Sequence, residues 1–482
     1  MNAPPKPFFL QALDALKRGD RRGAAALLGR ELREGNTAQK NLPSVAQLAA
    51  HIGEVELAID ASRRSIVPGS VPSLLAYWTV LATSGKPDEA LADVRRQPVS
   101  VRNHPSVLHF RGTVANQLGR FEEAEEMFRA ALAKAPDVMQ TWFSLAMVKT
   151  FQPGDPDLEA MERLDRQTLG PPEVKAILCY GIGKALEDCG DGDRAFEFYS
   201  NGAALRRQQS RFDTQQFART ADRTIADFTA DRLKALVPSQ AGDQRSLFVT
   251  GLPRSGTTLA EELLVAHSEV TDGAEVNLFG VALMPTLGAS FANALAYQQG
   301  FGDADPWGEI GRDYGHLIDV RFSGAGRIVD KSLGQAQFIG LMLHSLPDAR
   351  IAWLRRSPDD VALSCFRTYF SAGLDWTWSL ADIADYMKAE DRLFEHWQTV
   401  FPDRILVVPY EELVASPADW TAKLHRHFGL PVEATGSDRP RPTRSVTSAS
   451  VGQVRQAIST LRIGQAAKFE RQLKPFRDRY YA

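Results

Sequence analysis

The chain has 482 residues, of which 44% are hydrophobic and 24% are charged, and its formal net charge at pH 7 is -3. This length is too great for one ordinary domain, the composition excludes a largely disordered chain, and the near-neutral charge excludes a global attraction to nucleic acid or anionic membranes. Because the sequence shows neither a run of about 18 apolar residues nor a secretory leader, we expect a cytoplasmic protein with no membrane span and no nucleic-acid partner.

The first half of the sequence repeats with a period of about 34 residues. The clearest unit, from Pro105 to Pro136, predicts two amphipathic helices joined by a turn at Gly119. Small residues at Gly112 and Ala124 would let these two helices approach closely. The period resembles the tetratricopeptide repeat, whose units stack into a solenoid. Fainter copies have turn glycines at Gly19, Gly53, Gly85 and Gly190.

Three segments are expected along the chain. Residues 1–210 would form an all-α solenoid of tetratricopeptide-like repeats, residues 211–244 a helical linker, and residues 245–482 a domain built on a parallel sheet. The repeat resemblance implies a concave surface that would recruit a protein or peptide partner. The alternatives are that the solenoid supports the second half of the chain or forms a homodimer.

The second half begins with LFVTGLPRSGTTL from Leu247, which predicts a strand, a glycine-rich loop and a helix. Residues Gly251 to Thr258 read G-x-x-x-x-G-T-T, and the backbone N–H groups of such a loop can cradle a phosphate. Thr257 replaces the lysine that reaches the β and γ phosphates in nucleoside triphosphatases. Arg254 supplies a guanidinium that can meet oxyanion charge. A purely structural turn is the alternative.

The run PRSGTTL resembles the 5′-phosphosulfate loop of sulfotransferases, which move a sulfuryl group from 3′-phosphoadenosine 5′-phosphosulfate (PAPS) to an acceptor. The continuation LLVAHSEVTDGAE resembles protein-tyrosine sulfotransferases in particular. The resemblance extends from about Leu247 to the C-terminus and implies an α/β domain of P-loop type, with Glu275 as the catalytic base. It also implies that the donor is gripped by Arg254, Ser255, Gly256, Thr257 and Thr258.

Two later blocks extend this resemblance. Lys331 and Arg356 each follow a predicted strand, at the edge where open α/β sheets bind ligands. Lys331 matches the family lysine that faces the transferred group, and Arg356 with Ser364, eight residues later, matches the pair that holds the 3′-phosphate of PAPS. The alternatives are a solvated loop charge for Lys331 and a surface ion pair of Arg356 with Asp359 or Asp360.

Three positions have a second interpretation or depart from the family. Tyr410 matches a family tyrosine near the nucleotide, although an aromatic after a strand is equally expected in packing. Ser450 resembles a phosphosulfate contact of the C-terminal lid, but Arg462 and Ala466 depart from that lid's usual residues. Glu275 could instead cap the helix that follows it.

Together these features predict a PAPS-dependent sulfotransferase that works by in-line displacement and needs no metal. Glu275 would take the acceptor proton, while Lys331 and Arg254 would steady the charge on the sulfuryl and leaving oxygens. The expected acceptor is a protein or peptide tyrosine; a carbohydrate, lipid or small phenol is the alternative, because acceptors of all these classes share a donor site. Other interpretations are a P-loop kinase that uses ATP and a non-catalytic repeat scaffold whose nucleotide domain has decayed.

Overall fold

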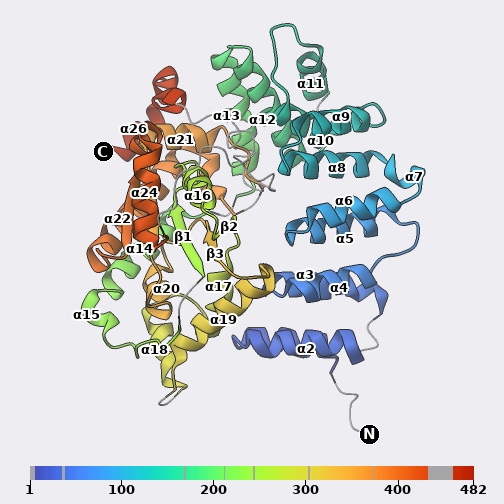
Figure 1. The fold of residues 1–482 in the computed structure, drawn as a ribbon. Coiled ribbons are helices and arrows are strands. Elements are labelled where there is room, and N and C mark those ends of the chain that lie inside the picture. Colours follow the sequence, from blue (N-terminus) through green and yellow to red (C-terminus); the bar gives the residue numbers. More distant parts are fainter. Residues whose placement is uncertain are drawn as a thin grey trace. The chain divides into compact units, whose positions relative to one another are not determined.

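The computed structural model describes residues 6–34, 38–167, 170–210, 212–242, 245–301, 304–371, 373–431 and 460–482. Helices are the regular structure of the described chain up to Leu233, and a five-stranded sheet with further helices follows (Figure 1). The expected fold class, a helical region followed by a parallel-sheet domain, is therefore confirmed.

The first six helices are short antiparallel pairs whose turns contain glycine. Gly53, in one of these turns, has a φ of 80°, a conformation that favours glycine. A Cβ atom at Gly53 would lie 2.7 Å from the side chain of Leu317, so glycine also permits the close approach of this turn to α19 (Pro306–Arg321). The pairs are α1 (Phe8–Lys17) with α2 (Arg21–Glu34), α3 (Leu42–His51) with α4 (Val55–Arg64), and α5 (Val71–Thr83) with α6 (Pro87–Arg96).

Later helices pack through small residues, as the sequence predicts. A Cβ atom at Gly112 of α8 would lie 2.6 Å from the Phe128 ring of α9, and Gly183 of α12 faces Tyr199 of α13 in the same way. Both helix pairs therefore require glycine at the point of contact. The helices here are α7 (Val99–Arg102), α8 (Pro105–Gln117), α9 (Phe121–Leu132), α10 (Met139–Val148), α11 (Pro156–Arg166), α12 (Pro172–Asp188) and α13 (Gly192–Arg207).

The sheet has the strand order β2-β3-β1-β4-β5. Strands β1 and β3 are parallel, with Phe248 opposite Asp330, and β4 and β5 are parallel, with Arg355 opposite Pro409. β1 is buried along its whole length, as expected of a central parallel strand. The strands are β1 (Ser246–Gly251), β2 (Val270–Asp272), β3 (Arg327–Asp330), β4 (Ile351–Arg355) and β5 (Ile405–Pro409).

Helices connect these strands and follow the last one. The principal ones are α14 (Thr214–Asp227), α15 (Ala230–Leu233), α16 (Thr257–Val265), α17 (Leu278–Ala282), α18 (Phe291–Gln299), α20 (Ile339–Ser345), α21 (Pro358–Phe366), α22 (Leu380–Val400), α23 (Tyr410–Ala415), α24 (Pro417–Phe428) and α26 (Lys474–Tyr480). Short 3-10 turns include η3 (Asp375–Trp378), η4 (Thr460–Arg462) and η5 (Gln465–Phe469).

The chain divides into two compact units, and each combines N-terminal helices with part of the sheet half. The first comprises Met1–Arg102, Thr224–Phe248 and Thr271–Arg350, and the second Asn103–Arg223, Val249–Val270 and Ile351–Ala482. Each compact unit therefore consists of three segments that are separate in the sequence. The division expected from the sequence, at residues 210 and 245, stays a prediction.

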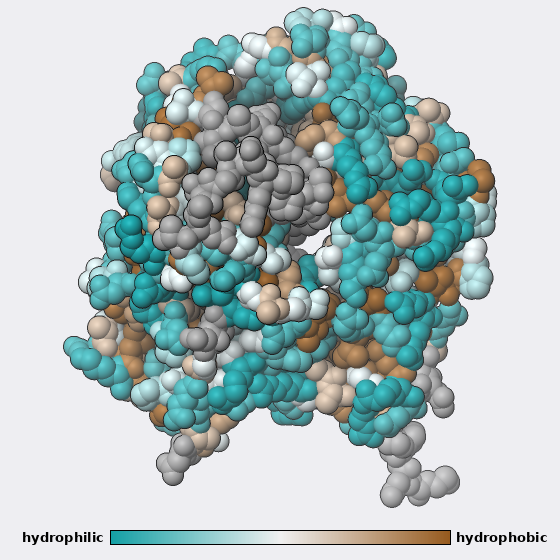
Figure 2. Space-filling model, viewed as in Figure 1, coloured by the Kyte–Doolittle hydropathy of each residue, from teal (hydrophilic) through white to brown (hydrophobic). Residues whose placement is uncertain are grey.

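The face of the molecule shown in Figure 2 is mainly hydrophilic. Hydrophobic residues lie among the hydrophilic ones in small groups. Among the residues that the structure describes, no helix is long and apolar enough to cross a membrane.

One buried carboxyl makes the stability of the second unit depend on pH. Glu390 of α22 is only 3% exposed, and its Oε2 atom has no hydrogen-bond partner. Burial raises the pKa of Glu390 to about 7, and the neighbouring Asp391 acts in the same direction. Because the folded state then binds this proton more tightly than the unfolded chain, the free energy of unfolding falls as pH rises from 4.5 to about 7.

Substitution Glu390→Gln, which keeps the side chain neutral, should remove this loss. At pH 8 the variant should exceed the wild type in free energy of unfolding by up to about 3 kcal/mol, and at pH 5 the difference should be much smaller. Thermal unfolding midpoints at both pH values would measure this. Glu395→Gln, at an exposed position of the same helix, is the matched control. Equal pH dependence in the wild type and Glu390→Gln would contradict the prediction.

Candidate functional site

The glycine-rich loop lies between β1 and α16, as its sequence predicts. Gly256, the N-cap of α16, has a φ of 104°, and a Cβ atom there would lie 2.4 Å from the Tyr410 ring. Thr257 and Thr258 begin the helix and are buried. Ser255 is 1% exposed and its hydroxyl has no hydrogen-bond partner. The loop thus offers an unmatched hydroxyl beside the positive end of a helix, a setting that favours an anion.

Arg254 contributes the charge of this loop. Its φ of 69° is left-handed, a conformation that costs about 1 kcal/mol or more for a residue with a side chain. Its Nε donates to the Ser364 hydroxyl at 3.0 Å. The pKa of Arg254 is lowered to about 10, mainly by burial and also by the nearby cations Arg367, Arg462 and Arg356, against the opposing effect of Cys365. Four guanidinium groups therefore repel one another around the loop.

Arg356 links the loop to the next helix and to the C-terminal segment. Its guanidinium donates to the carbonyl oxygens of Arg254 at 3.2 Å and Arg462 at 2.6 Å, and it lies over the Tyr410 ring at 4.5 Å. It also contacts Asp360 at 3.4 Å, but its side chain is only 10% exposed, so this is not the surface ion pair considered from the sequence. Asp359 pairs with Arg477 instead. Arg356 and Ser364 therefore both contact Arg254.

Asp360 fixes the C-terminal segment to α21. Its carboxylate, 1% exposed, accepts backbone N–H groups of Gly464 at 2.8 Å and Ala466 at 2.9 Å. This attachment brings Arg462 into the cationic cluster. The sequence interpretation treated Arg462 only as a departure from the expected lid, and its basic character was the one available signal. Ser450, the expected lid contact, lies outside the described residues.

Two other cations near these residues are paired. Arg367 forms an ion pair with Glu187 of α12, and Arg355 pairs with Asp391 at 2.6 Å. Arg367 still contributes to the repulsion on Arg254. Arg355, at the end of β4, is held by Asp391.

Lys331 and Glu275 form an ion pair in the first unit. Lys331 directly follows β3, is 1% exposed at its side chain, and places its Nζ 2.9 Å from Glu275 Oε1. It is not a solvated loop charge. The Glu275 side chain is 35% exposed, which leaves the carboxylate accessible. The N-cap residue of α17 is Asn277, whose side chain makes no capping hydrogen bond.

The aromatic candidates are buried. Tyr410, at the start of α23, is 7% exposed and packs between Gly256 and Arg356, so it both packs and borders the loop. Trp376 and Trp378 of η3 are core residues, and Trp376 stacks on Tyr386 with ring centroids 4.1 Å apart.

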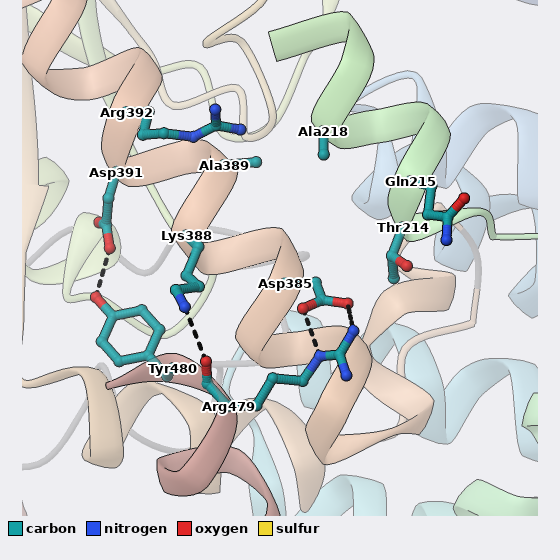
Figure 3. A pocket seen from close by; sticks show the side chains of 10 residues that line it. All are labelled: Thr214, Gln215, Ala218, Asp385, Lys388, Ala389, Asp391, Arg392, Arg479 and Tyr480. Atoms are coloured by element: carbon teal, nitrogen blue, oxygen red, sulfur yellow. Dashed lines mark hydrogen bonds and ion pairs between the residues drawn. The ribbon is translucent and has the colours of Figure 1, made fainter. Parts of the chain in front are cut away.

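A separate cavity of about 630 Å³ lies among α14, α22 and α26 (Figure 3). Several of its polar groups are paired: Arg479 pairs with Asp385, Asp391 accepts from Tyr480, and Lys388 donates to the Arg479 carbonyl at 2.9 Å. None of the residues predicted to act in the reaction lines it. Its lining is Thr214, Gln215, Ala218, Asp385, Lys388, Ala389, Asp391, Arg392, Arg479 and Tyr480.

Comparison with known proteins finds a similarity in the second half of the chain. Residues 246–434 match the model of the Sulfotransferase family. An uncharacterized protein of Aquifex aeolicus (strain VF5) is 26% identical over 387 residues, which are 77% of this chain and 50% of that protein, so the chain spans about half the length of the curated relative it matches. Residues 246–434 are therefore similar to sulfotransferases, as expected from the loop.

Solved structures with partial similarity come from two groups. The sulfotransferase domain from the curacin biosynthetic pathway is 14% identical, with a TM-score of 0.29, and covers 49% of this chain and 98% of its own. Sulfotransferase STF1 from Mycobacterium tuberculosis H37Rv is 15% identical, with a TM-score of 0.30, and covers 67% of this chain and 97% of its own. The MamA protein is 16% identical, with a TM-score of 0.27, and covers 36% of this chain and 96% of its own.

The cationic cluster should make the protein's stability respond to anions. Inorganic phosphate, titrated against chloride at constant ionic strength, should raise the melting temperature of the wild type by a few degrees, because a bound anion relieves the repulsion among the arginines. The same titration should leave Arg254→Met nearly unchanged. Arg355→Met, beside the cluster but paired with Asp391, should respond as the wild type does. An undiminished response of Arg254→Met would contradict this interpretation of the loop.

Proposed function

We propose that this protein is a PAPS-dependent sulfotransferase that transfers the sulfuryl group to the hydroxyl of a protein or peptide tyrosine. The observation that supports this most directly is the set of four arginines around a glycine-rich loop that has no lysine. Such a set suits a donor with negative charge at two separate positions. PAPS supplies the activated sulfuryl group, with the 5′-phosphate as its leaving group.

The loop and the region around α21 would bind different parts of the donor. The N–H groups of α16 with the hydroxyls of Ser255, Thr257 and Thr258 would hold the 5′-phosphate, since the buried Ser255 hydroxyl needs a partner. Arg356 and Ser364 would hold the 3′-phosphate, and Arg462 would add charge to that end. Tyr410 would border the nucleotide, and Ser450 would contact the phosphosulfate from the C-terminal lid.

Lys331 and Glu275 would serve the transfer itself. Lys331 directly follows β3, a parallel neighbour of β1, and ligands bind beyond the carboxyl ends of such strands. Glu275 would accept the acceptor proton as the acceptor oxygen bonds to sulfur and the bond from sulfur to the phosphate oxygen breaks. Lys331 and Arg254 would stabilise the charge that develops on the sulfuryl and leaving oxygens.

The acceptor class rests on the sequence resemblance. The run from Leu263 to Glu275 resembles protein-tyrosine sulfotransferases, and the N-terminal helix pairs would recruit the substrate protein. A carbohydrate, a lipid and a small phenol are the competing acceptors, and an assay that offers each of them separates the cases.

Removal of the proposed base should abolish transfer without loss of donor binding. With labelled PAPS and a tyrosine-containing peptide, Glu275→Gln should lower kcat by about 10²- to 10⁴-fold and leave the Kd for 3′-phosphoadenosine 5′-phosphate (PAP) within a factor of about two. Lys331→Ala should also lower kcat strongly. Glu269→Gln, at an exposed position that precedes β2, is the control. Normal turnover of Glu275→Gln would refute its role as base.

The 3′-phosphate pair can be tested by donor analogues. Arg356→Lys and Ser364→Ala should weaken PAP binding by about 10- to 100-fold, the value of a charge-assisted hydrogen bond, but should affect adenosine 5′-phosphate much less because it lacks the 3′-phosphate. Calorimetric titration of both nucleotides gives the comparison, with Arg355→Lys as the neighbouring control. Equal losses for both nucleotides would contradict the assignment, and tighter binding of magnesium ATP than of PAPS would favour a kinase.

A further inference from the structure

Asp330 joins three segments of the first unit. It is the last residue of β3 and is 2% exposed. One carboxylate oxygen accepts from the backbone N–H of Ser332 at 3.1 Å and from its hydroxyl, and the other accepts the Tyr314 hydroxyl of α19 at 2.7 Å. The Ser332 hydroxyl in turn accepts the backbone N–H of Asn277 at 2.8 Å. The carboxylate is thus bonded on both sides and closed to any substrate.

These bonds enclose the two groups proposed to react. Lys331 lies between Asp330 and Ser332, and its backbone N–H donates to the Ala274 carbonyl at 3.0 Å. Glu275 lies between Ala274, with a φ of 54°, and Asn277, with a φ of 51°. Left-handed residues of this kind cost about 1 to 3 kcal/mol each and persist only where their surroundings hold them. The segment that carries Glu275 therefore depends on the bond from Asn277 to Ser332.

The same support continues into the N-terminal helices. Asp313, which precedes Tyr314 on α19, forms an ion pair with Arg21 of α2, whose Nε donates to it at 2.5 Å. The Arg21 side chain is 1% exposed and also donates to Glu54 at 2.8 Å. Asp313 also accepts from Arg22 Nε at 3.0 Å, and a buried ion pair is costly to break from one side. The first helix pairs are therefore fastened to the helix that carries Tyr314.

We propose that Asp330 is a positioning residue that holds Glu275 and Lys331 in reacting geometry, and that the buried Arg21–Asp313 pair makes the first helix pairs part of the same support. This inference rests on the proposed function for its kinetic consequence. In this proposal the N-terminal helices help to hold the reacting groups in place, in addition to the recruitment of a substrate protein. Donor binding, which the proposed function gives to Arg254, Arg356 and Ser364, should be independent of this support.

The experiment compares three variants in the full chain. Asp330→Asn removes the acceptor charge, Tyr314→Phe removes one hydroxyl, and Arg21→Met breaks the ion pair. Hydrogen exchange of peptides that span residues 273–278 should become at least about tenfold faster in each, kcat should fall at least about tenfold in Asp330→Asn, and the Kd for PAP should stay within about twofold. Tyr297→Phe, whose hydroxyl donates to the Pro306 carbonyl at 3.1 Å, should change none of these.

Each result decides one point. Unchanged exchange at residues 273–278 in Asp330→Asn and Tyr314→Phe would overturn the proposal, and so would faster exchange with normal kcat. An equal loss of PAP affinity and kcat would show a general structural role instead. If Asp330→Asn or Arg21→Met does not fold, Tyr314→Phe still decides, because it deletes a single atom. A wild type that transfers sulfate to none of the acceptors would refute the proposed function, while the exchange measurement would still test the support of the Glu275 segment.

Discussion

The mutual repulsion of the arginines around the glycine-rich loop is the constraint that the second unit must accommodate. Two of them find carboxylates: Arg356 contacts Asp360, and Arg367 pairs with Glu187. Arg254 itself lies in a left-handed conformation and feels the other three. Such a site lowers the stability of the ligand-free protein, and the surrounding packing must offset this cost. Because a bound anion relieves this repulsion, affinity for an anion and instability without one have the same physical origin.

The packing that offsets this cost comes from the N-terminal helices. The hydroxyl of Tyr180 in α12 donates to the Phe366 carbonyl at the end of α21, and the Phe196 ring of α13 stacks on the Phe366 ring at 5.2 Å. In the first unit, the turn at Gly53 packs against α19. These helices therefore share hydrophobic cores with the sheet half, and deletion of them would expose apolar surface as well as remove a binding surface. Recruitment of a substrate protein would have to use the helix faces that these cores leave uncovered.

The sequence predicts well those features that depend on neighbours along the chain. The helix period places Gly112 against Phe128, and the strand, loop and helix around Gly256 follow from local composition. The sequence does not predict contacts between residues far apart, because periodicity carries no information on which distant segments meet. The Arg21–Asp313 pair, the Asp360 bonds to the C-terminal segment and the place of Arg462 in the cluster are all of this kind. Each residue of such a pair can be seen in the sequence, but the sequence does not show which two residues meet.

The residues proposed to bind the donor and the residues proposed to transfer the proton have different structural supports. The residues proposed to bind PAPS are held by β1, β4 and α21 with the C-terminal segment, whereas Glu275 and Lys331 are held by Asp330, Ser332 and α19. A substitution in the first set changes charge at the nucleotide and should act on affinity, while one in the second set changes the geometry of the reacting groups and should act on turnover. Because Arg21 pairs with Asp313 of α19, the proposed support predicts that substitution of Arg21 alters turnover rather than donor affinity.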